Sequence, residues 1–252
     1  MEDNKQNIQN SKNTLAMPIA IVVAAILIAG SVVYSGGKTK IDNTNNNDVA
    51  PGQKQQEQAG PSQNLDQVSP VTKEDHVRGN INAPVKIVEY SDTECPFCKK
   101  FHETMKQVIG EYGKSGKVAW VYRHYPLDQL HSKARKEAEA TECAGGLGGN
   151  DKFWEYLDRL MEVTPANNGL DPAELPKIAE YVGLDKTKFN ECLSSGKYAQ
   201  KIEEHVQNAM ATGGNGTPWS IVISKNGKKY PLNGAQPYES IKQLIETALQ
   251  DK

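Results

Sequence analysis

The sequence is poor in the features that mark several common classes of protein. Only four of its 252 residues are cysteines, too few for a small scaffold held together by disulfides. Charge is nearly balanced, with 29 basic against 31 acidic residues, and no basic stripe or acidic tail points to nucleic acid or to a solvating partner arm. No internal repeat is visible, so a repeat architecture is not indicated.

One long apolar run lies near the N-terminus. Leu15 to Tyr34 contains no charged residue, and a helix rising about 1.5 Å per residue would cover the roughly 30 Å of a bilayer's hydrocarbon core. We expect a retained signal-anchor at residues 15–35, preceded by a tail at 1–14. A cleavable signal peptide is the alternative, with Ala29, Gly30 and Ser31 as small residues near a cleavage site. Either interpretation exports the rest of the chain and places it outside the cytoplasm.

The next segment is polar and of low complexity. Residues 36–70 are dominated by Asn, Gln, Gly, Ser and Pro and include TNNND and GQKQQEQ. Such a segment cannot bury enough apolar surface to offset the entropy lost on ordering. We therefore predict a flexible linker at 36–70 and a globular domain at 71–252.

The globular part alternates between strand and helix signals. VKIVEY at 85–90 predicts a strand, and apolar residues at helical spacing predict a helix that ends near 112. A second strand is expected at 118–123, strands at 219–224 and 229–232 flank Asn226-Gly227, and a helix closes the chain. Between them, five helices are expected at 132–143, 151–163, 172–182, 186–194 and 198–210. This order predicts an α/β sheet with an all-helical insertion at about 126–212.

Cys95-Pro96-Phe97-Cys98 falls where the first strand gives way to a helix. Free backbone N–H groups and the positive end of the helix dipole stabilise a thiolate at Cys95. The spacing within one helical turn brings both sulfurs to one face, and Pro96 suits the first turn because it needs no N–H there. The motif therefore favours a redox-active pair.

A metal site is the rival interpretation of the same cysteines. His102 follows Cys98 by four positions, but a structural zinc site needs four ligands and the sequence has no second close pair. Lys99 directly after Cys98 excludes attachment of a c-type haem. We expect no metal and interpret His102 as a solvated or capping residue of the helix.

Several blocks resemble one family. GNINAPVKIVEYSDTECPFCKKF is similar to the start of DsbA-type proteins of the thioredoxin superfamily, in the group with an N-terminal anchor and a C-P-x-C motif. VYRHYPL, EAEATECAGGLGGNDKFWEYLDRL and GNGTPWSIVI continue the resemblance in order over 71–252. It implies a thioredoxin-like fold, thiol–disulfide exchange without a cofactor, reduced exported proteins as substrates and a membrane redox partner.

The resemblance also implies roles for individual residues. Cys95 would be the exposed nucleophile and Cys98 the buried resolving thiol, with Pro96 and Phe97 tuning the direction of electron flow. Thr217-Pro218 is similar to the family's cis-proline loop, which faces the cysteines.

Two acidic residues stand near the cysteines in the sequence. Glu89, six positions before Cys95, matches a buried acid that could relay the proton of Cys98. From the residues alone, Pro218 could instead be an ordinary trans proline and Glu89 could lie on a solvated face. Glu94 is expected to be exposed.

Cys143 and Cys192 both fall in the helical block. In an exported domain two leftover cysteines indicate a structural disulfide, which would stabilise the fold by about 4 kcal/mol in the chain-entropy model. Two buried free thiols are the alternative.

The sequence thus predicts an extracytoplasmic oxidoreductase that introduces disulfides through Cys95 and Cys98. An isomerase or reductase of the same fold is the first alternative. A non-catalytic domain that binds extended peptides or metal is the second.

Overall fold

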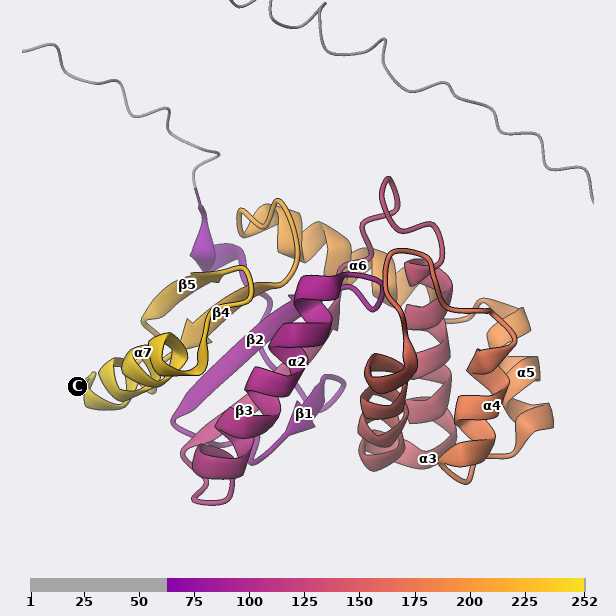
Figure 1. The fold of residues 1–252 in the computed structure, drawn as a ribbon. Coiled ribbons are helices and arrows are strands. Elements are labelled where there is room, and N and C mark those ends of the chain that lie inside the picture. The colour runs from indigo at the N-terminus through magenta and orange to yellow at the C-terminus, as the bar shows by residue number, and fades with distance from the viewer. Residues whose placement is uncertain (1–62, 252) are drawn as a thin grey trace, which may run out of the picture. The chain divides into compact units, whose positions relative to one another are not determined.

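The structure is a computed structural model and describes residues 63–251. Five strands form one sheet in the order β1-β3-β2-β4-β5 (Figure 1). β2 and β3 run parallel, and the other neighbouring pairs run antiparallel. The strands are β1 His76–Arg78, β2 Val85–Ser91, β3 Val118–His124, β4 Trp219–Ile223 and β5 Lys229–Asn233.

β2 lies at the centre of the sheet because its residues are apolar on both faces. Val85, Ile87, Val88 and Tyr90 have no exposed surface. Ile87 packs with the helices on one face, whereas Val88 belongs to the core on the other. A strand that is covered on both sides reads as a nearly continuous apolar run, and Glu89 is the one charged residue within its buried part.

Helices cover both faces of the sheet. α2 (Pro96–Val108) and α7 (Tyr238–Gln250) share a core with β2, β3 and β4 on one face. α2 passes into a wider helical turn at Ile109–Gly113. On the other face, Val206 and Ala209 of α6 (Ala199–Ala211) pack on the sheet.

The predicted helical insertion is present between β3 and β4. It consists of α3 (Ala134–Val163), α4 (Glu174–Tyr181), α5 (Lys186–Ser195) and α6, and has a core of its own around Tyr156, Leu160 and Phe189. Two helices were expected where α3 runs. The joint between them is a single kink at Gly149, whose φ of 77° is accessible to glycine without strain.

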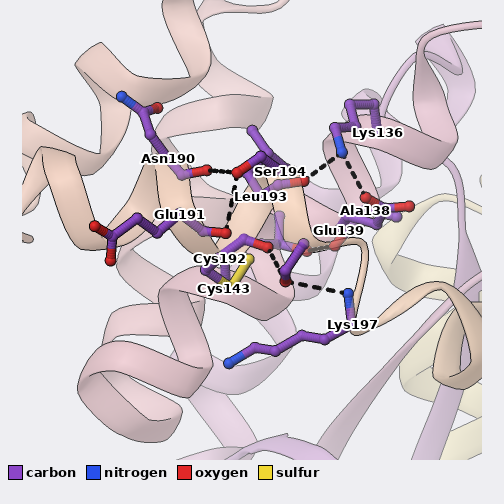
Figure 2. Close-up of a disulfide and its surroundings, with 12 residues drawn as sticks. Lys136, Ala138, Glu139, Cys143, Asn190, Glu191, Cys192, Leu193, Ser194 and Lys197 are labelled. Atoms are coloured by element: carbon purple, nitrogen blue, oxygen red, sulfur yellow. Dashed lines mark hydrogen bonds and ion pairs between the residues drawn. A yellow bond between two sulfur atoms is a disulfide. The ribbon is translucent and has the colours of Figure 1, made fainter.

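A disulfide between Cys143 and Cys192 joins α3 to α5 (Figure 2). Both residues are buried, with 1% and 8% of their surface exposed. Lys136 donates hydrogen bonds to the carbonyl oxygen of Leu193 and to the Glu139 carboxylate beside the bridge. The bond therefore fixes two helices that are 49 positions apart in sequence.

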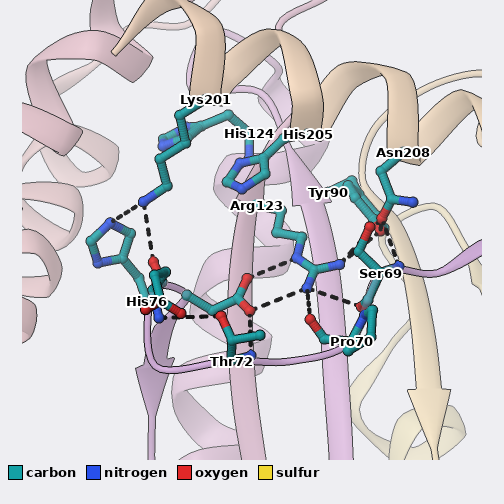
Figure 3. A network of polar contacts seen from close by, with 12 residues as sticks. Ser69, Pro70, Thr72, His76, Tyr90, Arg123, His124, Lys201, His205 and Asn208 are labelled. Atoms are coloured by element: carbon teal, nitrogen blue, oxygen red, sulfur yellow. Dashed lines mark hydrogen bonds and ion pairs between the residues drawn. The ribbon is translucent and has the colours of Figure 1, made fainter. Parts of the chain in front are cut away.

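Residues 63–70 correct the expected end of the linker, because they pack on the domain. Arg123 of β3 is buried and donates to the carbonyl oxygens of Ser69 and Pro70, each at 3.1 Å (Figure 3). It also donates to the Asp75 carboxylate at 2.8 Å. Val68 is buried in the same core as Val88. A buried guanidinium needs several hydrogen-bond acceptors. The backbone carbonyl groups of Ser69 and Pro70 supply two of them, and amino-acid composition gives no sign of this role.

The expected anchor at 15–35 and most of the linker lie outside the described residues. Within residues 63–251, no helix combines the length and the apolar character needed to cross a bilayer. β1 is a short strand beyond those predicted.

Candidate active site

The Cys95–Cys98 segment sits at the carboxyl end of β2. Cys95 is in extended conformation and precedes the first residue of α2, Pro96, so the helix begins directly after the first sulfur. The Cys95 amide donates to the Asp92 carbonyl oxygen at 3.2 Å, and its own carbonyl accepts from Lys99 at 3.0 Å. Pro96 fits because its position needs no N–H donor.

The two sulfurs differ in their surroundings, and both are free thiols. Cys98 is wholly buried, and the Asp92 amide donates to its sulfur at 3.4 Å. Cys95 lies 3.5 Å from the Thr217 carbonyl oxygen and is only 4% exposed. The expectation of an exposed nucleophile is wrong for the residue as a whole. The exposed members of the motif are Pro96 and Phe97, and Phe97 is 64% exposed.

Electrostatics separate the two thiols further. Hydrogen bonding from Cys98 lowers the pKa of Cys95 to about 6, with further lowering by Thr217 and by the amides of Cys98 and Phe97, against the effect of burial. Burial raises the pKa of Cys98 well above its usual value, and the charges of Cys95 and Glu89 raise it further. Cys95 is therefore the thiolate at neutral pH, and Cys98 keeps its proton.

The peptide bond between Thr217 and Pro218 is cis. It directly precedes β4, where Trp219 pairs with Tyr90 of β2. The preceding glycines allow close packing, since a Cβ on Gly214 would lie 2.7 Å from the Trp219 ring. The Trp219 indole donates to Thr212 at 2.9 Å and fixes the end of α6. The pairing of β4 with β2 thereby places the Thr217 carbonyl group next to Cys95.

Glu89 is completely buried. It follows Ile87 by two positions, so its side chain lies on the same sheet face as the core that contains Cys98. The Trp120 indole donates to Oε2 at 2.7 Å, and Oε1 has no partner among the described residues. Burial raises the pKa of Glu89 to about 7. A carboxyl group that titrates at neutral pH thus lies where it acts electrostatically on Cys98.

The expected exposure of Glu94 is wrong, since the residue is completely buried. The Asn167 amide donates to its carbonyl oxygen at 2.7 Å, and the Asn168 amide donates to its carboxylate. These two residues belong to a loop of the insertion, more than seventy positions further along the chain. Local sequence carries no signal for such a contact.

His102 is not the solvated or capping residue that the sequence suggested. It is buried, and its Nε2 lies 2.7 Å from an oxygen of Asp158. Burial lowers the pKa of the imidazole. Across residues 63–251, no group of three or more His, Cys, Asp or Glu side chains is placed to hold a metal ion. His102 therefore joins α2 to α3.

The family model described as Thioredoxin matches residues 71–247 of the chain. The chain belongs to the thioredoxin family. Within that family, DsbA2 of Pseudomonas aeruginosa is similar in structure, with 26% identity, a TM-score of 0.62 and coverage of 72% of this chain and 98% of that one. Oxidised BdbD of Bacillus subtilis shares 24% identity and has a TM-score of 0.61, covering 70% and 94%. The thioredoxin-family domain therefore has a DsbA-like fold, the fold of thiol–disulfide oxidoreductases.

Curated relatives of this thioredoxin-family chain carry a different name. The Na⁺/H⁺ antiporter NhaA 1 of Salinispora arenicola is 35% identical over 73% of this chain and 26% of its own length. NhaA 3 of Salinispora tropica is 33% identical over 79% and 29%. The chain thus spans little more than a quarter of these relatives, and the antiporter name describes the longer proteins.

Proposed function

We propose that the protein is an extracytoplasmic oxidase of thiols, which introduces disulfides into exported proteins through Cys95 and Cys98. The observation that carries the proposal is the asymmetry of the two thiols. The pKa of Cys95 is lowered to about 6, whereas that of Cys98 is raised. A thiolate stabilised in the reduced protein makes the corresponding disulfide a stronger oxidant.

The reaction consists of two exchanges. In the oxidised protein, a substrate thiolate attacks the Cys95 sulfur, the Cys95–Cys98 bond breaks, and Cys98 leaves as a thiolate that takes up a proton. A second substrate thiolate then attacks the substrate sulfur of the mixed disulfide and expels Cys95. The substrate loses two electrons, and the protein gains them as a thiolate at Cys95 and a thiol at Cys98. The low pKa of Cys95 favours this second departure.

Glu89 supports the first exchange, in which Cys98 is the leaving group. Its pKa of about 7 leaves a substantial fraction protonated at neutral pH, on the sheet face shared with Cys98. The acid can therefore return a proton to the thiolate that leaves Cys98, and no cofactor is needed. The Thr217–Pro218 loop would bind the backbone of an extended substrate beside Cys95.

The location and partners are part of the same proposal. The apolar run at residues 15–35 would anchor the chain in the membrane with its domain outside the cytoplasm. The Cys143–Cys192 disulfide is of the kind that persists in oxidising compartments. A quinone-linked membrane oxidase would restore the Cys95–Cys98 disulfide after each cycle.

The equilibrium potential of the Cys95–Cys98 pair in the full-length protein tests the direction. Equilibration with glutathione should give a value near the oxidising end, about −120 mV, and a value near the −270 mV of thioredoxin would assign a reductase. Cys95→Ala should abolish oxidative refolding of a reduced ribonuclease. Lys100→Ala, an exposed change on the same helix, is the matched control.

A further inference from the structure

Two buried carboxyl groups lie in the surroundings of the active-site cysteines and act on each other electrostatically. Glu94 directly precedes Cys95 and is completely buried, while Glu137 lies in the first turn of α3 and is 2% exposed. The Thr93 hydroxyl donates to Oε2 of Glu137 at 2.6 Å. Oε1 of Glu94 has no donor among the described residues. A buried carboxylate oxygen without a donor is costly.

A proton shared between Glu94 and Glu137 would give the buried Oε1 atom of Glu94 its hydrogen-bond donor. Burial, followed by hydrogen bonding with Glu94, raises the pKa of Glu137 to about 8. A protonated Glu137 can donate to the Glu94 carboxylate and so supply the missing partner of Oε1. Two unprotonated carboxylates at this place would repel each other in a poorly solvated site.

The Glu94 carboxylate also holds a loop of the helical insertion. Ala166, Asn167 and Asn168 have φ values of 64°, 53° and 63°, a conformation that residues other than glycine rarely adopt. The Asn168 amide donates to the Glu94 carboxylate and the Asn167 amide donates to the Glu94 backbone carbonyl oxygen, which sets two of these three residues against the active-site segment. Such a backbone persists only where its surroundings hold it.

Further contacts place the same loop across the cysteine motif. Asn168 donates to the Leu130 carbonyl oxygen at 2.9 Å and accepts from the Lys133 amide at 3.2 Å. Lys99, directly after Cys98, donates to the Thr164 carbonyl oxygen at 2.6 Å. The loop is thus attached on both flanks of the motif, and Asn167 is exposed beside it.

We propose that Glu94 and Glu137 form a proton-dependent clasp that positions the 166–168 loop as a wall of the substrate site. Glu94 and Glu137 are positioning residues, since they act through the loop. This proposal rests on the proposed function for its effect on substrate, but the clasp itself can be observed without turnover.

The direction of the pH effect follows from the groups that face the pair. Asp92 acts on Glu137 as a further carboxyl group and is hydrogen-bonded to His131, while Tyr156 acts on Glu137 from the part of α3 beyond the kink at Gly149. The shared proton is present below about pH 8 and is lost above it. The clasp therefore holds in neutral solution and opens as the pH rises, because Glu94 and Asp92 then face a third negative charge.

Hydrogen exchange of the Asn167 and Asn168 amides in the full-length protein tests the clasp. After correction for intrinsic exchange, protection in the wild type should fall about tenfold between about pH 7 and about pH 9. Glu94→Gln keeps an acceptor for Asn168, and its amide can donate to the Glu137 carboxylate when Glu137 loses its proton, so its protection should stay constant. Equal pH dependence in both proteins would overturn the proposal, as would constant protection in the wild type.

Three further measurements separate the possible causes. Glu137→Gln should also remove the pH dependence of protection. This second variant keeps the proposal testable if Glu94→Gln does not fold. Glu103→Gln, on the exposed face of α2, should behave as the wild type. KM for a reduced peptide should rise with pH in the wild type more than in Glu94→Gln, with similar kcat. A protein that shows the exchange change but no oxidation would retain the clasp and refute the proposed function.

Discussion

The Thr217 carbonyl oxygen lies 3.5 Å from the Cys95 sulfur, although 122 positions separate the two residues. The sheet brings them together, because β4 pairs antiparallel with β2 and places Trp219, directly after the Thr217-Pro218 segment, opposite Tyr90 near the end of β2. The helical insertion leaves β3 and returns at β4, so its residues do not interrupt this pairing. The geometry at the sulfur is therefore set by the sheet.

Cys98→Ser should convert the protein into a trap for its substrates. Cys95 would keep its exposed neighbour Phe97 and the Thr217 contact, but no second thiol could displace a bound substrate from within the protein. Oxidised glutathione charges Cys95 of the variant as a mixed disulfide, and the thiolate of an exported protein with a single reduced cysteine then attacks the Cys95 sulfur and expels glutathione. The resulting mixed disulfides should accumulate, because neither protein holds a second thiol to break them, and should disappear on reduction, as seen by non-reducing gels and mass spectrometry. Cys95→Ser should form none. Equal trapping by the two variants would contradict the assignment of Cys95 as nucleophile.

Glu89→Gln should stabilise the protein at neutral and higher pH. Burial raises the pKa of Glu89 from 4.5 to about 7, so the folded state holds a proton that the unfolded chain releases between these values. The associated stability is present below about pH 4.5 and is lost as pH rises to about 7. The variant should gain up to about 3 kcal/mol over the wild type across this range.

Urea unfolding of both proteins at a series of pH values measures this difference. The same variant should oxidise peptide thiols more slowly, because Cys98 loses its neighbouring proton donor. A stability difference that does not change between about pH 4.5 and about pH 7 would rule out the raised pKa of Glu89.

Removal of the Cys143–Cys192 disulfide should lower the stability of the fold but leave the redox potential of the active-site pair unchanged. Cys143→Ser with Cys192→Ser opens a closed segment of 49 positions, and the chain-entropy model assigns to it about 4 kcal/mol. The melting temperature should fall, while the potential of the Cys95–Cys98 pair should stay unchanged. Ser194→Ala, a change on the exposed side of α5, controls for local disturbance. A shifted potential would show that the two cysteine pairs are coupled.

The sequence was sufficient for features that depend on neighbouring residues. The apolar run of β2, the glycine-rich break in α3 and the proline after Cys95 each have a local physical cause. The predicted α/β order with a helical insertion is confirmed, and the family match extends over 71–247. The predicted anchor lies outside the described residues and stays a prediction.

Burial of charged residues was the part that the sequence could not supply. Glu94 is covered by Asn167 and Asn168, and His102 is held by Asp158, through contacts that span 74 and 56 positions. Arg123 likewise gathers Ser69 and Pro70 onto the domain. In each case the polar group forms a hydrogen bond with a residue far away in the sequence. The hydrophobic periodicity of the sequence does not indicate which distant residues come into contact.

The buried disulfide of the insertion has a consequence for a protein that works by thiol exchange. Each catalytic cycle generates reactive thiolates, and any disulfide within their reach is open to attack in line with its sulfurs. Cys143 and Cys192 are almost fully covered, and Lys136 ties Leu193 and Glu139 together next to them. Both cysteine pairs are nearly buried, with Cys95 4% and Cys192 8% exposed, but they belong to separate cores. The disulfide of the insertion is thus held apart from the Cys95 thiolate and is shielded from scrambling by the reaction that the active-site pair performs.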